Sequence, residues 1–233
     1  MLGRLYGLGV GPGDPELITV KAARILQESS VIAFPKKRDG HNSYAYYIVD
    51  TYIDQEEKEM LGLIFPMTKD PEELNQKWSH SVEQIWEKLA AGKDVAFVTE
   101  GDPLLFSTFI FMMNLMRDRH PEAVIEIVPG ITSMGGAAAR LGIPLADGED
   151  HVAIIPACDD YDTMKKAIND HDCIVFIKVA KVKDLMLQVL KDLNLLDRAY
   201  VVTKVTSEDE IIWKTNELAG VELEYLSLMV VRK

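Results

Sequence analysis

The feature that most constrains this chain is the alternation of short apolar segments with amphipathic ones. Apolar segments of strand length are expected at 5–10, 31–34, 60–65, 94–99, 123–128, 152–156, 173–179, 199–204 and 223–231. Segments with a helical spacing of apolar residues are expected at 16–27, 43–52, 71–91, 108–117, 132–141, 162–168 and 181–193. Strands that alternate with helices are typical of α/β proteins, in which helices cover the faces of a sheet. The sequence therefore predicts an α/β fold.

One polar segment divides this pattern into two halves. Residues 117–121 read Arg-Asp-Arg-His-Pro and follow an expected helix. Charged residues that end in proline favour a connection over a continued helix. A chain of 233 residues is long enough for two small domains. We therefore expect an N-terminal α/β domain at 1–118 and a C-terminal α/β domain at 119–233.

The charge balance narrows the possible partners. The chain has 25 Lys and Arg against 37 Asp and Glu, which gives a net charge of −12. Nucleic acids and anionic membrane surfaces bind basic proteins, so neither is an expected partner. The two cysteines lack the paired spacing of a zinc site, so no metal is expected. No apolar run reaches the roughly 20 residues of a membrane span, and no secretory leader is evident, so the cytoplasm is the expected location.

A glycine-rich loop lies between the first expected strand and the first expected helix. A dinucleotide-binding fingerprint fails there, because Pro12 or Asp14 stands where the last glycine is required. Phosphate sites also use the positive end of a helix. Here Asp14 is a natural N-cap, Pro15 takes the first helical position and Glu16 lies in the first turn. These carboxylates offset the helix dipole, so we expect a tight turn and no phosphate site.

A second acidic turn, Glu-Gly-Asp-Pro at 100–103, follows a later expected strand. Ligands of open α/β sheets bind at the carboxyl ends of the strands. Two acidic loops at such ends suit a cationic ligand, and S-adenosylmethionine, with its sulfonium and ammonium groups, is one. The same tetrapeptide is also common in plain turns, so both interpretations stay open.

Three motifs in order resemble those of the tetrapyrrole methylases, the class III S-adenosylmethionine-dependent methyltransferases. They are Gly-Val-Gly-Pro-Gly-Asp-Pro at 9–15, Thr-Glu-Gly-Asp-Pro-Leu-Leu-Phe-Ser-Thr at 99–108, and Pro-Gly-Ile-Thr-Ser at 129–133 with Leu-Gly-Ile-Pro-Leu at 141–145. Further segments resemble one branch of that family: Phe-Pro-Lys at 34–36, Phe-Pro-Met-Thr-Lys-Asp at 65–70 and Tyr-Leu-Ser-Leu at 225–228. The resemblance covers essentially the whole chain.

The resemblance implies two α/β domains with the cofactor in a cleft between them, and a homodimer. It also implies methylation of carbon 20 of precorrin-2 or cobalt-factor II in cobalamin (vitamin B12) biosynthesis, with S-adenosylhomocysteine as product. The alternatives are methylation at another tetrapyrrole position, methylation of diphthine, and a non-catalytic module that binds tetrapyrrole or cofactor. The segment at 65–70 argues against the first two, and the intact motifs at 101–103 and 129–133 against the third. No residue decides between metal-free and cobalt-loaded substrate.

The motifs of this family also imply which residues contact the cofactor. In the first two-thirds of the chain these are Pro12, Gly101, Asp102, Leu105, Thr132 and Ser133. In the last third they are Lys178, Val179, Val205 and Leu226. Many family members read Tyr-Met-Gly where this chain reads Ile-Lys-Val at 177–179, which leaves the contacts of that segment open.

Methyl transfer from a sulfonium makes modest demands on catalytic groups. The leaving group is neutral, so it needs no general acid, and positioning of two reactants can contribute about 7–11 kcal/mol. This agrees with a sequence that shows no triad, metal cluster or carboxylate pair. A base could still remove a proton from the methylated carbon. The candidates are Lys178, Tyr225, His80 and His151, although an ordinary surface role is open for each.

A tetrapyrrole that carries many carboxylates needs local cations on so acidic a protein. The densest basic run is Lys36, Lys37 and Arg38, with His41 close behind, and we expect it to bind substrate. A solvated loop is the alternative. A dimer interface could include the apolar face of the helix near residue 112, although burial in the core is the alternative there. That face carries Phe109, Met112, Met113 and Met116.

Overall fold

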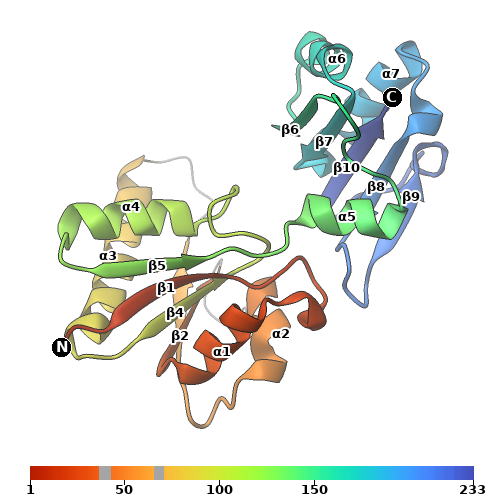
Figure 1. Ribbon diagram of the computed structural model, residues 1–233. Coiled ribbons are helices and arrows are strands. Elements are labelled where there is room, and N and C mark those ends of the chain that lie inside the picture. The colour runs from red at the N-terminus through yellow and green to blue at the C-terminus, as the bar shows by residue number, and fades with distance from the viewer. Residues whose placement is uncertain (37–42, 66–70) are drawn as a thin grey trace. The chain divides into compact units, whose positions relative to one another are not determined.

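Contacts within the chain separate it into two α/β units, which confirms the expected fold class (Figure 1). The computed structural model describes residues 1–36, 43–65 and 71–233. The first unit spans 1–132 and the second 133–233. The boundary expected after residue 118 falls before strand β5 (Val124–Val128), which pairs with β1 (Arg4–Gly9). Because this pairing makes β5 part of the first sheet, the division lies beyond it.

In the first unit, the described residues form a five-stranded sheet in the order β3-β2-β4-β1-β5, and every pairing is parallel. The other strands are β2 (Val31–Lys36), β3 (Glu59–Ile64) and β4 (Val95–Thr99). Central strands such as β4 are buried at every position, which suits a strand covered on both faces. In register, Leu8 lies beside Val98 and Val128. Parallel pairing puts all the carboxyl ends at one edge.

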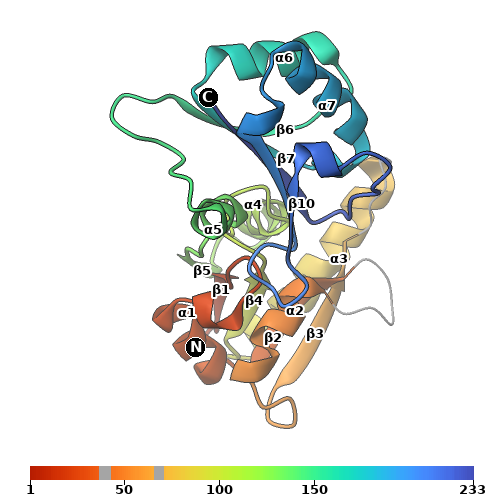
Figure 2. The same ribbon diagram turned by 90° about the vertical axis from the view of Figure 1, so that its right-hand side faces the viewer.

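Helices cover both faces of this sheet, as Figures 1 and 2 show. One face packs with α1 (Val20–Glu28) and α2 (Tyr44–Val49), and the other with α3 (Pro71–Ala90) and α4 (Phe109–Arg119). Strand side chains alternate between the two cores, because successive residues point to opposite faces. The apolar stripe of α4 is at most 7% exposed and belongs to the core, so it is not available for a dimer interface. Its members are Phe109, Met112, Met113 and Met116.

The second unit has a mixed sheet in the order β6-β7-β10-β8-β9. Its strands are β6 (Val152–Pro156), β7 (Cys173–Ile177), β8 (Ala199–Thr203), β9 (Ile211–Lys214) and β10 (Ser227–Arg232). Strand β10 lies in the middle and runs antiparallel to both β7 and β8. One core packs under α6 (Tyr161–Asp170) and α7 (Lys183–Asp192), and α5 (Ser133–Leu141) contacts β10.

Candidate functional site

Three loops meet where β4, β1 and β5 end. These strands are neighbours in the sheet, so the loops that follow them lie side by side. The Val10 amide donates a hydrogen bond to the Thr99 carbonyl (3.1 Å), and the Gly101 amide donates one to the Gly11 carbonyl (2.8 Å). The glycine-rich loop and the acidic turn, which the sequence singled out separately, are therefore joined through their backbones.

Glycines allow this close approach. A Cβ added at Gly9 would lie 2.5 Å from the Gly101 carbonyl oxygen and 2.5 Å from the Gly130 nitrogen. A Cβ at Gly130 would lie 2.1 Å from the same Gly101 oxygen. Gly101 itself has a φ of 62°, a conformation that favours glycine. The three loops can therefore pack backbone against backbone, which a side chain at Gly9 or Gly130 would prevent.

The carboxylate of Asp102 links two of the loops. Its Oδ2 accepts a hydrogen bond from the Gly130 amide (3.1 Å), and its Oδ1 accepts one from the Leu104 amide (2.9 Å). The sequence suggested that this carboxylate faces a cationic ligand. The structure adds a role that the sequence did not reveal, because the same two oxygens also hold the turn and the loop after β5 in place. Asp102 remains partly exposed at the end of β4.

Two buried hydroxyl groups support the rest of the acidic turn. Thr99 Oγ1 and Ser107 Oγ lie 2.9 Å apart, and Ser107 Oγ also accepts a hydrogen bond from the Phe109 amide (3.1 Å). Between them the turn exposes apolar side chains: Leu104 is 49% exposed and Phe106, at a φ of 54°, is 51% exposed. Exposed apolar groups on a braced turn can contact the apolar part of a ligand.

The first loop has the local structure that its sequence predicts. Asp14 is the N-cap of a short 3-10 helix that starts at Pro15, and its side chain accepts a hydrogen bond from the Glu16 amide (2.8 Å). Within these three loops, the carboxylates of Asp14, Glu16, Glu100 and Asp102 are accompanied by no Lys or Arg. The loops therefore favour a cation and disfavour a phosphate. Pro12 is buried, whereas Leu105, Thr132 and Ser133 are partly exposed.

The second unit gathers its four expected cofactor contacts at one edge of its sheet. Strands β7 and β8 end there and the antiparallel β10 begins there. Lys178 is exposed and left-handed (φ 59°), and the Lys204 amide donates to the Leu226 carbonyl (2.8 Å). The side chains of Val179 and Val205 are buried, so only their backbones can meet a ligand.

Glu210 is a residue of this edge that sequence reasoning missed. Its Oε2 accepts a hydrogen bond from the Thr206 amide (2.6 Å), and its Oε1 accepts one from Arg140 Nε of α5 (2.7 Å). The Glu210 side chain is only 7% exposed. It therefore fixes the loop after β8, where Lys204 and Thr206 both have a positive φ. No motif marks this glutamate, because its contact with Arg140 joins residues 70 positions apart in the sequence.

The four candidate bases lie in different parts of the structure. In the second unit, Lys178 follows β7 and Tyr225, which is 51% exposed, precedes β10 at the same edge. His151 precedes β6, which is parallel to β7, so it lies at the opposite edge; its amide donates to Asp172 Oδ2 (2.9 Å). His80 is exposed on α3 of the first unit. The topology of the second unit thus favours Lys178 and Tyr225 over His151 as groups near a ligand at that edge.

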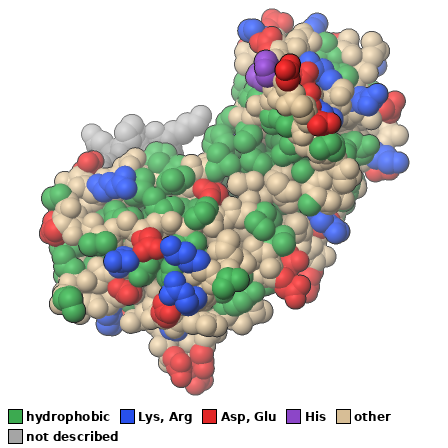
Figure 3. Space-filling model, in the orientation of Figure 1, with side chains coloured by type: hydrophobic (Ala, Val, Ile, Leu, Met, Phe, Trp, Pro, Cys, Tyr) green, Lys and Arg blue, Asp and Glu red, His purple; other side chains and the backbone are tan. Residues whose placement is uncertain are grey.

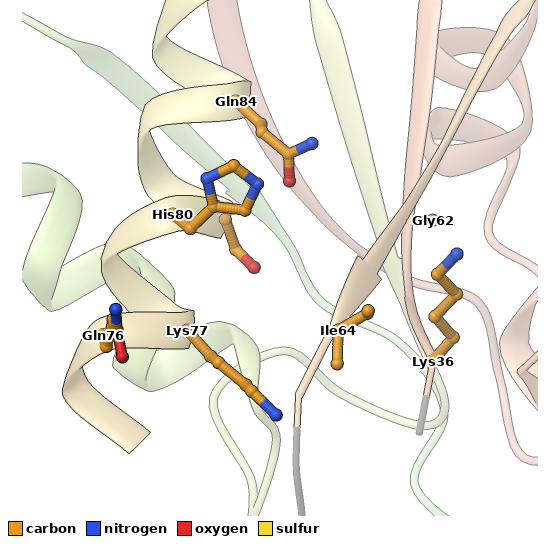
Figure 4. A pocket seen from close by; sticks show the side chains of 8 residues that line it. Lys36, Gly62, Ile64, Gln76, Lys77, His80 and Gln84 are labelled. Atoms are coloured by element: carbon orange, nitrogen blue, oxygen red, sulfur yellow. The ribbon is translucent and has the colours of Figure 1, made fainter. Parts of the chain in front are cut away.

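Of the expected substrate cations, Lys36 ends β2, whereas Lys37, Arg38 and His41 lie outside the described residues. Lys36 lines a pocket of about 600 Å³ at the edge of the first sheet (Figure 4). The other lining residues come from β3 and α3: Gly62, Ile64, Gln76, Lys77, His80, Ser81 and Gln84.

Two further features are absent from residues 1–36, 43–65 and 71–233. No group of three or more His, Cys, Asp or Glu side chains is placed so that it could hold a metal ion there. Within the same described ranges, no helix has the length and apolar character needed to cross a membrane.

Comparisons of this sequence and structure with known proteins all find methyltransferases that act on tetrapyrroles. The family model described as Tetrapyrrole (Corrin/Porphyrin) Methylases matches residues 4–219. A cobalt-precorrin-2 C(20)-methyltransferase of Salmonella typhimurium is 37% identical over 100% of this chain and 98% of its own length. A precorrin-2 C(20)-methyltransferase of Sinorhizobium is 30% identical over 99% of this chain and 95% of its own length. The solved uroporphyrin-III C-methyltransferase of Thermus thermophilus, complexed with S-adenosylhomocysteine, shares the fold (TM-score 0.70, 20% identity, 99% of this chain and 92% of that one).

Proposed function

Because this chain belongs to the tetrapyrrole (corrin/porphyrin) methylase family, we propose that it methylates carbon 20 of the cobalt complex of precorrin-2. It is an S-adenosylmethionine-dependent C-methyltransferase of cobalamin biosynthesis. The observation that carries this function is the match to relatives of that activity over the whole chain. The relative named for the cobalt substrate is 37% identical and the one named for the metal-free substrate 30%, which supports the cobalt form. The cytoplasm stays a prediction from sequence.

The three loops of the first unit fit the cofactor. When bound, S-adenosylmethionine supplies a methyl carbon on a cationic sulfur. Gly9 and Gly130 let the loops meet backbone to backbone at the strand ends, and the carboxylates of the loops favour the positive charge. Pro12, Gly101, Asp102, Leu105 and Thr132 are the proposed contacts on this unit, and Ser133, Lys178, Val179, Val205 and Leu226 those on the second.

The residues of this chain act chiefly by binding and orienting. A ring carbon of the tetrapyrrole would take the methyl group from sulfur, and the neutral thioether left behind would need no proton from a side chain. The hydrogen on the methylated carbon would be lost as a proton, for which Lys178 and Tyr225 are the acceptors that we propose. Asp102 and Glu210 hold loops that the two reactants would contact, which serves the positioning that such a reaction needs.

One incubation tests the function. The protein is mixed with S-adenosylmethionine and precorrin-2, with and without cobalt, and the tetrapyrrole is followed by mass and absorbance. We expect a gain of one methyl group, and a 13C-labelled methyl group located at carbon 20 by NMR. Methylation at another carbon would favour another activity of the same family, and binding without a mass gain would favour a non-catalytic module.

We also propose that the enzyme is a homodimer, as the resemblance implies. The buried stripe of α4 cannot supply the interface, but the same helix exposes Phe111 (52%), which stacks on Trp78 with ring centroids 4.8 Å apart. A large exposed aromatic side chain held by stacking is the kind of group that interfaces bury. Phe111 is therefore the residue of α4 that we propose to lie at or near the interface.

A further inference from the structure

Two buried hydroxyl groups lie side by side at the edge of the second sheet where the expected cofactor contacts gather. Thr203 is the last residue of β8 and Ser227 is the first of β10, and the two residues are opposite each other in register. Thr203 Oγ1 and Ser227 Oγ are 2.8 Å apart, and the residues are only 2% and 4% exposed. Figure 3 shows charged side chains on the surface of the second unit, where water solvates them. The two buried hydroxyl groups instead need partners inside the protein.

The indole of Trp213 adds a third polar group to this pair. Trp213 lies in β9, and its Nε1 donates a hydrogen bond to Thr203 Oγ1 (3.3 Å). An indole N–H is a donor only, so Thr203 Oγ1 accepts from it and keeps its own hydroxyl hydrogen for Ser227. The three side chains thus connect β9, β8 and β10, which are neighbours in the sheet.

The hydroxyl pair lies on the core side of the sheet. Side chains alternate along a strand, so Thr203 shares a face with Val201, and Ser227 shares a face with Met229. Val201 and Met229 both belong to the core that packs under α6 and α7. The two hydroxyl groups therefore act on a ligand through the backbone segments that they hold.

Those segments contain two of the proposed cofactor contacts. Val205 follows Thr203 by two residues, and Leu226 directly precedes Ser227. Between the two segments, the Lys204 amide donates a hydrogen bond to the Leu226 carbonyl (2.8 Å). The hydroxyl pair is therefore the buried end of a connection that continues to the cofactor contacts.

The loop after β8 needs this support because its backbone conformation is unfavourable. Lys204 has a φ of 47° and Thr206 a φ of 65°, although neither residue is glycine. Such residues keep this conformation only where surrounding contacts hold it. Glu210 holds the loop to α5, whereas the hydroxyl pair holds it to the segment before β10. Val205 lies between the two residues of positive φ, so a loop that relaxed would move it.

We propose that Thr203 and Ser227 are positioning residues for the cofactor, because their hydrogen bond fixes the segments that carry Val205 and Leu226. Trp213 assists as the donor that orients the Thr203 hydroxyl. The inference rests on the proposed function and deepens it, because none of these three side chains was among the expected contacts.

The test compares two buried threonines of the second unit. Thr203→Val removes one hydroxyl group, Thr203→Ser keeps it, and Ser227→Ala removes the partner. The control is Thr215→Val. Thr215 is 5% exposed and its Oγ1 donates to the Leu196 carbonyl (2.5 Å), but it follows β9 at the opposite edge of the sheet. Calorimetry gives the affinity for S-adenosylhomocysteine, steady-state methyl transfer gives KM and kcat, and thermal unfolding gives stability.

We expect Thr203→Val and Ser227→Ala to raise the dissociation constant of S-adenosylhomocysteine and the KM for S-adenosylmethionine roughly three- to ten-fold. At saturating cofactor, kcat should stay within about two-fold of the wild type, because reactants once bound still align. Thr203→Ser should bind as the wild type does. The double variant of Thr203→Val and Ser227→Ala should bind no more weakly than the weaker single variant, because both remove the same hydrogen bond. Thr215→Val should lower the melting temperature and leave the affinity unchanged.

Affinities equal to the wild type in Thr203→Val and Ser227→Ala would overturn the positioning role. An equal loss of affinity in Thr215→Val would also overturn it, because the effect would then follow from a general loss of stability. If Thr203→Val does not fold, Ser227→Ala and the control decide between these outcomes. A wild type that neither binds S-adenosylhomocysteine nor transfers a methyl group would instead refute the proposed function.

Discussion

At the scale of single residues, Asp102 combines two roles that a substitution can separate. Replacing it with Ala removes the acceptors of both the Gly130 and Leu104 amides, whereas Asn keeps one carbonyl oxygen without the charge. We expect Asp102→Ala to lower affinity for S-adenosylhomocysteine and turnover, and to reduce stability by about 1–3 kcal/mol, while the protein still folds. Calorimetry and denaturant titration measure both effects. Unchanged affinity and turnover in the folded variant would refute the ligand role.

Gly130 gives a steric test of the place where the loops meet. A methyl group there would lie 2.1 Å from the Gly101 carbonyl oxygen, so one loop must move. We expect Gly130→Ala to lower the melting temperature and weaken S-adenosylhomocysteine binding, with a stability loss of about 1–3 kcal/mol.

The control for this change is Gly148→Ala. It has a φ of 56° and nothing within 4 Å of an added Cβ, so it introduces only the left-handed strain of about 1–2 kcal/mol. Cofactor affinity should be the same in Gly148→Ala and wild type. If Gly130→Ala also binds as the wild type does, the loops have room that the structure does not show.

The roles of some of these residues could be predicted from the sequence and the roles of others could not. The difference is whether a role depends on nearby residues or on distant ones. The cap at Asp14 depends on neighbours within three residues, so its role was evident before the structure. The contact of Gly9 with Gly101 and Gly130 depends on strand order, which brings together residues about 30 to 120 positions apart. Nothing local to any of the three glycines reveals that contact.

At the scale of elements, Glu210 ties α5 to the loop after β8. Glu210→Ala leaves the Thr206 amide and Arg140 without this acceptor, whereas Glu210→Gln keeps a carbonyl oxygen for the amide. We expect Glu210→Ala to raise the KM for S-adenosylmethionine several-fold with little change in kcat, and Glu210→Gln to restore part of it. Glu28→Ala, which breaks an exposed pair with Arg24, is the control and should alter neither value. Equal effects of Glu210→Ala and Glu28→Ala on KM would contradict the positioning role.

Asp150 ties the segment before β6 to β10. Hydrogen bonds from Arg232 (2.5 Å) and from the Asp147 amide (2.8 Å) hold the pKa of its carboxyl below the ordinary value of 3.8. A carboxyl with a lowered pKa stabilises the fold above its ordinary pKa, and this contribution is lost as pH falls through the lowered value. We therefore expect Asp150→Asn to be less stable than the wild type at neutral pH, with a difference that shrinks below pH 3.8.

Denaturant midpoints at several pH values measure this difference. Asp159→Asn, at an exposed carboxylate of the same unit, serves as the control and should follow the wild type across the range. If the difference in stability between Asp150→Asn and the wild type stays the same as the pH falls, the ion pair does not contribute to stability.

Most elements lie where periodicity predicts them, since each depends on its own burial pattern. The helix expected at 71–91 is α3, and the strand expected at 94–99 is β4. Two differences have local causes. The first expected helix is split, because Thr19 caps α1 anew after a 3-10 turn. The four-residue strand β9 was missed, because an edge strand with exposed Ile211 and Ile212 has too short a pattern to identify.

At the scale of the whole molecule, the homodimer is the main prediction. Sedimentation equilibrium at micromolar concentration should give twice the chain mass of 26.1 kDa. Phe111→Glu would replace the exposed aromatic ring of α4 with a charged group, so it should shift the equilibrium between monomer and dimer toward the monomer. Lys191→Glu, on α7, should leave this equilibrium unchanged. A wild type that sediments as a 26.1 kDa monomer would refute the dimer.

The central place of β10 in the second sheet has a consequence for synthesis. The ribosome makes β10 after the other four strands, so the nascent chain carries β7 and β8 before the strand that joins them exists. The first unit can fold during elongation, because its strands are complete by residue 128. The second unit cannot complete its sheet until β10 is made. Until then, the edges of β7 and β8 that β10 will cover stay unpaired and can pair with other strands. Slow translation before residue 227 would therefore prolong the period in which the chain depends on chaperones.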